Sequence, residues 1–147
     1  MWFSRKQVAK TPAGGGASAA GQITTKRLGD AAESLALAHL LRAGLVAVEA
    51  NYHTPGRGGG EVDLIMRAPD GTLVFVEVRR RKSRSHGGAG ASIGALKQRR
   101  IIFAARHYLM RFASCPPCRF DVVLVEGEVE APGGLSVEWL RGAFDAD

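Results

Sequence analysis

The sequence predicts a single mixed α/β domain whose helices pack on a central sheet, and three features of the chain lead to this fold class. Its 147 residues match the size of one domain, and 46% of them are hydrophobic, which is enough for a buried core. Three strand-like runs follow one another between residues 45 and 81. Helical patterns lie on both sides of these runs, so we expect the order α-β-β-β-α-β.

Residues 1–22 are expected to form a disordered tail in front of a folded domain at residues 23–147. Pro, Gly, Ala and Ser are abundant in the tail, and no periodic apolar face runs through its Gly- and Ala-rich part. The first helix should begin near Thr24, which can serve as its N-cap, and end at about Arg42. Gly44 then stands where a C-terminal cap belongs.

The three strand-like runs occupy residues 45–52, 61–67 and 73–81. The third is rich in β-branched and aromatic residues, which favour strands. The turn signal Pro69-Asp70-Gly71 lies between the second and third runs, so we expect these two strands to form a hairpin.

A second helix and further strand follow the hairpin. Ser92 can cap a helix that extends to about Phe112. Residues 119–126 form a fourth predicted strand, and residues 135–140 are a candidate for a short fifth strand.

Two carboxylates lie on one face of the predicted hairpin. Side chains alternate between the faces of a strand, so Glu77 points away from its valine neighbours, and Asp63 is set in the same way. Adjacent carboxylates raise each other's pKa, and a divalent cation such as Mg²⁺ or Mn²⁺ would relieve their repulsion. The alternative is a set of cross-strand ion pairs with Arg79 and Arg81. A third acid, Glu33 of the first helix, is by itself an unremarkable surface residue.

Positive charge is concentrated in one window of the chain. The net charge of +6 is weak evidence on its own, but residues 78–112 hold ten of the 20 Lys and Arg residues and no acidic residue. Arginine favours bidentate contact with phosphate, so the window predicts a surface for the nucleic-acid backbone. The alternative is a merely solvated face. The residues expected to bind nucleic acid are Arg80, Arg81, Lys82, Arg84, Lys97, Arg100 and Arg111.

The two cysteines, Cys115 and Cys118, form a Cys-Pro-Pro-Cys motif. No second ligand pair for zinc is present, and the motif precedes a strand instead of opening a helix, so we expect two reduced thiols. No targeting segment is visible, and no run approaches the roughly 18 apolar residues of a membrane span. We therefore expect a cytoplasmic protein with no membrane partner.

Four of these segments resemble the YraN family of bacterial proteins of uncharacterised function. The resemblance covers residues 24–126, and the motifs agree with the family in order and spacing. This family is similar to archaeal Holliday junction resolvases and to the wider PD-(D/E)XK nuclease superfamily. The motifs are Gly60-Glu61-Val62-Asp63-Leu64-Ile65, Phe75-Val76-Glu77-Val78-Arg79, Lys97-Gln98-Arg99-Arg100-Ile101 and Arg119-Phe120-Asp121-Val122-Val123.

The resemblance implies a restriction-endonuclease-like fold, which is a mixed sheet flanked by helices. It implies Glu33, Asp63 and Glu77 as metal ligands, and Asp63, Glu77 and Arg79 as catalytic residues. One departure stands out, because the superfamily has a lysine where this chain has Arg79. Arginine stays protonated and cannot act as a base, although it can orient water or stabilise developing charge.

Taken together, these features predict a nucleic-acid-binding protein that is a Mg²⁺- or Mn²⁺-dependent endonuclease. DNA is favoured over RNA, branched DNA is a candidate substrate, and a homodimer remains open. One alternative is a non-catalytic nucleic-acid-binding module, which Arg79 favours. Another is a protein-interaction domain whose basic face meets an acidic protein.

Overall fold

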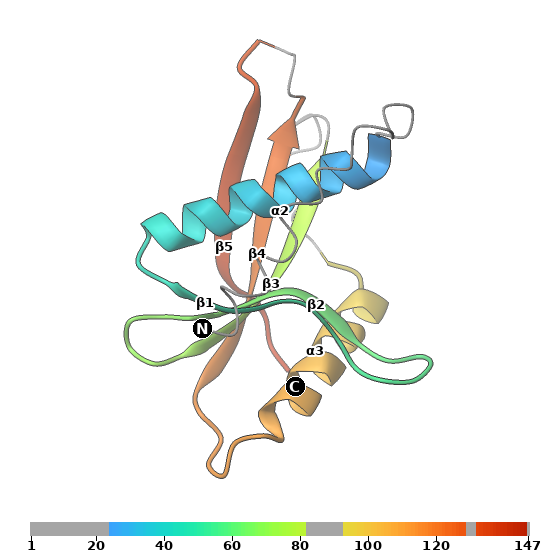
Figure 1. Cartoon of the computed structure of the whole chain (residues 1–147), viewed down its shortest axis with the longest axis vertical. Helices are drawn as coiled ribbons and strands as arrows, with labels where there is room; N and C mark the ends of the chain where they lie inside the picture. Colours follow the sequence, from blue (N-terminus) through green and yellow to red (C-terminus); the bar gives the residue numbers. More distant parts are fainter. Residues whose placement is uncertain (1–23, 82–92, 129–131, 147) are drawn as a thin grey trace, which may run out of the picture.

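A computed structural model describes residues 24–81, 93–128 and 132–146 of the chain (Figure 1). The predicted tail and the expected cap Ser92 lie outside the described residues. The elements follow in the order α-β-β-β-α-β-β, which confirms the mixed α/β class. They are α2 (Thr24–Arg42), β1 (Val46–His53), β2 (Glu61–Arg67), β3 (Leu73–Arg81), α3 (Ala95–Leu109), β4 (Cys118–Gly127) and β5 (Leu135–Phe144).

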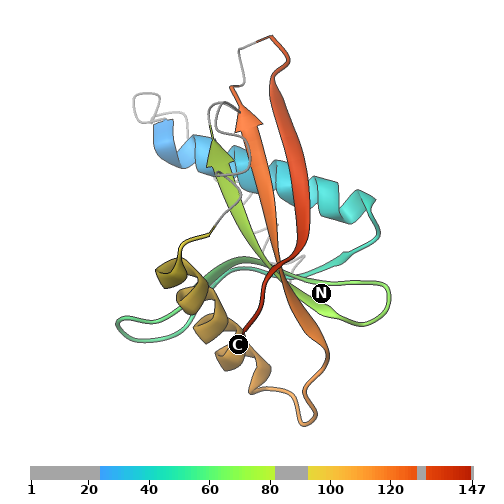
Figure 2. The ribbon, with the colours of Figure 1, turned by 180° about the vertical axis from the view of Figure 1, so that it is seen from behind.

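The five strands form one mixed sheet in the order β1-β2-β3-β4-β5. Neighbouring strands are antiparallel except for β3 and β4, which run parallel. A parallel pair needs a crossover between the two ends of the sheet, and α3 lies in that connection. The two helices cover opposite faces of the sheet, as the front and back views show (Figures 1 and 2).

Helix α2 packs on one face of the sheet. Ala32, Ala36 and Leu40 recur every four residues, so they share one side of the helix, and all three are buried. They pack with Val74 and Val76 of β3 in one hydrophobic core. The burial is confined to one side of the helix, since Leu41 is 46% exposed.

Helix α3 packs on the opposite face. Ile101 and Tyr108 are buried against Phe75 of β3 and Phe120 of β4 in a second core. The rings of Phe75 and Phe120 lie 5.7 Å apart, centroid to centroid. Because β3 alternates between the two cores, Glu77 takes the α3 side of the sheet, in line with Phe75.

The predicted turns and most strand limits agree with the structure. Strands β2 and β3 have the expected bounds, and Gly71 closes their hairpin with φ +94° and a hydrogen bond from its N–H to the Ala68 carbonyl at 2.9 Å. Gly44 follows α2 with φ +100°, as expected of a C-terminal cap.

Helix α3 and strand β5 differ from the expected limits. Helix α3 begins at Ala95 after Gly94, which gives no side-chain cap, and it ends at Leu109 instead of near Phe112. Strand β5 runs to Phe144, four residues beyond its expected end. It continues because the side chain of Asp121 on β4 accepts a hydrogen bond from the N–H of Gly142 at 2.9 Å.

Candidate active site

The ladder between β2 and β3 ends beside the two candidate carboxylates. Its last registered pair is Leu64 with Val76. Next along β2, Oδ2 of Asp63 accepts a hydrogen bond from the backbone N–H of Val78 at 2.8 Å. This contact holds the Asp63 carboxylate against β3, where it lies next to Glu77.

Glu77 is buried without a full set of hydrogen bonds. The residue is 7% exposed, and its Oε1 atom receives no hydrogen bond from any described residue. Burial and the charge of Asp63 together raise the pKa of Glu77 to about 8. Burial also raises the pKa of Asp63, although the Val78 hydrogen bond opposes the effect. The two acids therefore cannot both ionise easily at neutral pH.

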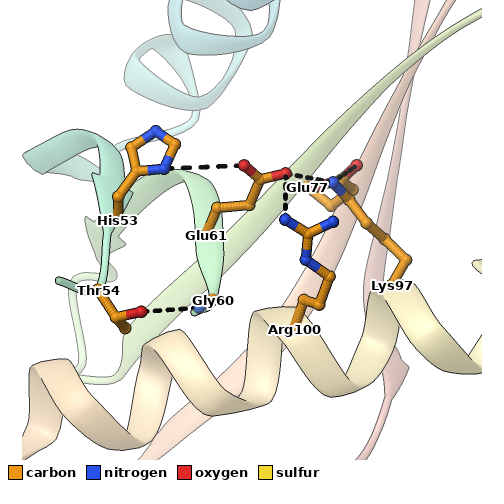
Figure 3. Close-up of polar contacts among 7 residues, drawn as sticks. All are labelled: His53, Thr54, Gly60, Glu61, Glu77, Lys97 and Arg100. Carbon is orange, nitrogen blue, oxygen red and sulfur yellow. Dashed lines mark hydrogen bonds and ion pairs between the residues drawn. The ribbon is translucent and has the colours of Figure 1, made fainter. Parts of the chain in front are cut away.

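Two cations from α3 and one histidine lie around Glu61 at the start of β2, and one of the cations also reaches Glu77 (Figure 3). Nζ of Lys97 lies 2.9 Å from Oε2 of Glu61 and 3.7 Å from Oε2 of Glu77. Arg100 and His53 approach Glu61 more loosely, at 4.0 Å and 3.7 Å. The Lys97 hydrogen bond lowers the pKa of Glu61, so this outer acid stays ionised while Glu77 does not.

Gly60 allows α3 to lie close to the start of β2. A Cβ atom at Gly60 would stand 2.6 Å from the backbone nitrogen of Ala104 and would meet the carbonyl of Arg100. The N–H of Gly60 donates to Oγ1 of Thr54 at 2.8 Å, which fixes the loop that leads into β2. The missing side chain thus brings Lys97 within reach of the carboxylates (Figure 3).

The arginines at the end of β3 take different partners. Arg81 forms an ion pair with Glu126 of β4, and Nη2 of Arg80 donates to the carbonyl of Gly127 at 3.3 Å. The sequence left open cross-strand ion pairs of Asp63 and Glu77 with Arg79 and Arg81, and the ion pair recorded for Arg81 is the one with Glu126. Arg79 lies two residues beyond Glu77 and is partly buried.

The expected nucleic-acid-binding residues that the structure describes have different partners. Lys97 and Arg100 point toward Glu61. Arg111 lies beyond the end of α3, stacks over the Tyr108 ring at 3.9 Å and approaches Oε1 of Glu49 at 3.9 Å. Lys82 and Arg84 lie outside the described residues. Residues 78–112 contain no acidic residue, but in the folded protein their cations contact acids of three strands: Glu49 of β1, Glu61 of β2 and Glu126 of β4.

The outer side of α3 carries a second set of cations. Arg99 and Arg106 are exposed, and neither has an acidic partner within 4.0 Å among the described residues. Leu96 and Phe103 lie on the same side of the helix and are 64% and 52% exposed. We call these four residues the outer face of α3; it combines positive charge with apolar surface.

The donor chemistry of the carboxylate pair fits a hard divalent cation. Carboxylate oxygens suit Mg²⁺ or Mn²⁺, and Mg²⁺ commonly takes only one or two protein carboxylates. The unmatched Oε1 of Glu77 is an oxygen that such an ion would satisfy. Glu33 lies on α2, and in the described parts of the chain no three His, Cys, Asp or Glu residues gather closely enough to hold an ion. The ligand role that the resemblance implies for Glu33 stays a prediction.

Sequence reasoning did not include Glu61 in the site, and it did not foresee that Lys97 contacts Glu61 and Glu77. The alternation of β2 puts Glu61 on the same face as Asp63, so its proximity to the site had a signal in the sequence. No sequence signal predicted the contact of Lys97 with these acids, because its position depends on how closely α3 approaches Gly60.

The two cysteines are both exposed free thiols. Burial and the neighbouring Cys115 raise the pKa of the Cys118 thiol, which makes it a weak nucleophile. Cys118 is the first residue of β4, and Cys115 lies three residues before it.

Comparison with known proteins identifies relatives along nearly the whole chain. The model of an uncharacterised protein family, UPF0102, matches residues 32–125. A UPF0102 protein of Polaromonas naphthalenivorans (strain CJ2) is 68% identical over 154 aligned positions, which cover 99% of each chain. A UPF0102 protein of Acidovorax sp. (strain JS42) is 63% identical, over 84% of this chain and 88% of its own. None of these names states an activity.

No helix in the part of the chain that the structure describes is long and apolar enough to cross a membrane.

Proposed function

The chain belongs to the uncharacterised protein family UPF0102, and we propose that it is a metal-dependent nuclease that hydrolyses phosphodiester bonds in DNA. The observation that carries the proposal is the buried pair Asp63 and Glu77. Burial raises the pKa of both members, the charge of Asp63 raises the pKa of Glu77 further, and one oxygen of Glu77 lacks a donor among the described residues. A fold has no structural reason to keep such a pair, whereas a site for a divalent cation requires it.

Asp63 and Glu77 would hold Mg²⁺ or Mn²⁺. When bound, such an ion supplies Lewis-acid activation of water and neutralises charge on the scissile phosphate. Asp63 is held in position by the Val78 N–H, so one ligand is fixed before any ion arrives. Glu77 stands on a central strand that is paired along its length with β4, which gives the second ligand a rigid base.

Arg79 follows the pair on the same strand. Its guanidinium cannot give up a proton at neutral pH, so we assign it an electrostatic role near the phosphate and not that of a base. Losing one contact that stabilises developing charge typically costs about 10²–10³-fold in rate. Arg79→Ala should therefore reduce cleavage strongly, and Arg79→Lys should retain it.

The outer face of α3 is the surface best suited to hold the nucleic acid. Arg99 and Arg106 have no acidic partner to displace among the described residues, unlike Lys97, Arg81 and Arg111. Such contacts to the phosphate backbone set the register of the protein on the strand without reading its sequence. Phe103, exposed between the two arginines, offers a ring on which an unpaired base can stack. A substrate with unpaired bases, such as branched DNA, fits this combination.

A non-catalytic nucleic-acid-binding module is the second candidate, and Arg79 is the observation that favours it. A protein that binds DNA through the same outer face would need no hydrolysis. Metal binding by Asp63 and Glu77 would then serve only stability.

The test is a cleavage assay with Mg²⁺ and with Mn²⁺ on branched, linear duplex and single-stranded DNA. Wild-type protein should cleave at least one substrate, and Glu77→Gln, which keeps the shape of the side chain, should not. Binding to DNA without cleavage under either metal would support the binding module. A wild type that neither binds nor cleaves DNA would refute both functions.

A further inference from the structure

We propose that Lys97 of α3 is a catalytic residue of this site and supplies the mobile positive charge that acts on the scissile phosphate beside Asp63 and Glu77. The inference rests on the proposed nuclease function. It moves Lys97 from the nucleic-acid-binding surface expected from sequence to the centre of the chemistry. The inference also gives Lys97 of α3 a role distinct from that of Arg79, which lies on β3.

The position of Lys97 supports this role. Its Nζ atom is 3.7 Å from Oε2 of Glu77 and 2.9 Å from Oε2 of Glu61. Within the described residues, Lys97 is the one cation recorded within 4.0 Å of Glu77, whose Oε1 remains unmatched. Arg100, one turn further along α3, reaches only Glu61 and stays more exposed.

The fold holds Lys97 in place from two sides. Helix α3 lies against the backbone of Gly60, which no other residue would permit without a shift. At the start of the helix, Nε2 of Gln98 donates to the carbonyl of Ile93 at 2.8 Å. The main chain of Lys97 is therefore anchored on both sides, while its flexible side chain can exchange a carboxylate for a phosphate oxygen.

The chemistry of an ammonium group suits this exchange. Lysine is a compact charge with three donors on a flexible stem, whereas the planar arginine fork is fixed in geometry. A lysine side chain is ordinarily charged at neutral pH, so Lys97, whose Nζ lies 2.9 Å from Oε2 of Glu61, can serve as an electrostatic contact to phosphate.

Lys97 and a divalent cation would both lie next to the carboxylate of Glu77. A positive charge 3.7 Å from Glu77 repels a second one, so Lys97 must turn away from the pair when an ion is held there. The side chain then remains near the site with its charge free for the substrate. Removing this charge should leave metal binding intact or strengthen it, while it removes the contact to the phosphate.

The experiment compares Lys97→Met with the matched control Arg100→Met, in which the same helix loses a cation that contacts Glu61 but not Glu77. Three quantities are measured for each protein: the rise in melting temperature with Mg²⁺ or Mn²⁺, the affinity for branched DNA in Ca²⁺, and the rate of cleavage in Mg²⁺. For Lys97→Met we expect a metal-induced rise at least as large as in the wild type and a modest loss of affinity. We expect cleavage to fall by about 10²-fold or more. Arg100→Met should lose less cleavage than Lys97→Met, because the contact recorded for Arg100 is with Glu61 and not with Glu77.

Three outcomes would overturn the inference. If Lys97→Met cleaves as fast as Arg100→Met, Lys97 is only a counter-ion of Glu61. If Lys97→Met loses the metal-induced rise in melting temperature, Lys97 is a structural support of the metal site. A wild type that shows neither the metal-induced rise nor cleavage refutes the proposed function itself, and the role of Lys97 falls with it. The first two failures leave the wild-type results intact, so they are distinguishable from the third.

Discussion

At the scale of single residues, three buried carboxylates differ in their hydrogen-bond and ion-pair partners. Asp121 is fully buried and accepts hydrogen bonds from the side chains of Arg119 and Trp139 and from the Gly142 N–H. Glu126 is paired with Arg81. Glu77 alone among these three keeps an oxygen without a donor. The unmatched oxygen of Glu77 therefore supports the proposal that this site holds a cation.

Sequence reasoning could identify Asp63 and Glu77 but not their environment. Period-two alternation placed both side chains on one face of the hairpin, and the structure brings them together. The partners of the nearby charges could not be foreseen, because Glu126 and Arg81 lie on different strands whose register depends on the parallel β3–β4 pairing.

The raised pKa of Glu77 predicts how stability depends on pH in the absence of metal. Glu77 titrates near 4.5 in the unfolded chain and at about 8 in the folded protein, so between these values the folded state holds the extra proton. The free energy of unfolding should therefore fall as the pH rises from about 5 to 8 in a chelating buffer. Glu77→Gln should flatten this dependence and be more stable than the wild type at pH 8. Equal slopes for the two proteins in urea titrations would show that Glu77 is not protonated in the folded state.

At the scale of elements, α3 serves two purposes on its two sides. Its inner side delivers Lys97 to the carboxylates and closes the core with Ile101 and Tyr108. Its outer side presents Arg99 and Arg106 to solvent. The sequence predicted a basic helix without acids, but it could not assign each cation to a side, since acids from β2 face only the inner one.

The close approach of α3 to β2 predicts a large effect of Gly60→Ala. The added methyl group would meet the backbone of Arg100 and Ala104, so the helix must shift, at a cost of about 1–3 kcal/mol in the free energy of unfolding. The shift should also move Lys97 and slow cleavage. Gly94→Ala is the control, because a Cβ atom there meets nothing within 4 Å. Denaturant titrations that find both variants equally stable would contradict the tight contact.

Charge reversal on the outer face of α3 should weaken DNA binding for all sequences alike. We expect Arg99→Glu with Arg106→Glu to lower the affinity and to reduce the slope of log K against log salt by about 2, one for each lost phosphate contact. Arg42→Glu with Arg141→Glu changes the net charge equally at exposed positions on other elements, so it separates a local contact from a general charge effect. If both double variants bind DNA alike, the outer face is not the binding surface.

At the scale of the whole molecule, the sequence predicted the class of fold better than its extent. Strands β2 and β3 have the expected bounds because β-branched residues and a strong turn signal define them. Strand β5 was expected to end at Leu140, but it continues to Phe144. Its length depends on Asp121 of β4, a contact between residues far apart in the chain. The ligand role implied for Glu33 depends likewise on where α2 lies across the sheet, and it stays a prediction.

Metal binding should stabilise the whole domain, because the two ligands stand on adjacent strands of its central sheet. An ion that binds only the folded state stabilises it by RT ln(1 + [L]/Kd), which is about 1.4 kcal/mol at a tenfold excess over Kd. For a chain of this size that corresponds to a rise of about 3–6 °C in melting temperature.

We expect millimolar Mg²⁺ or Mn²⁺ to produce this rise in the wild type, and chelation to reverse it. Glu77→Gln should lose the rise because only one ionised ligand remains, whereas Glu33→Gln should retain it if the site uses two acids. A wild-type melting temperature that ignores both metals would argue that Asp63 and Glu77 share a proton instead of an ion.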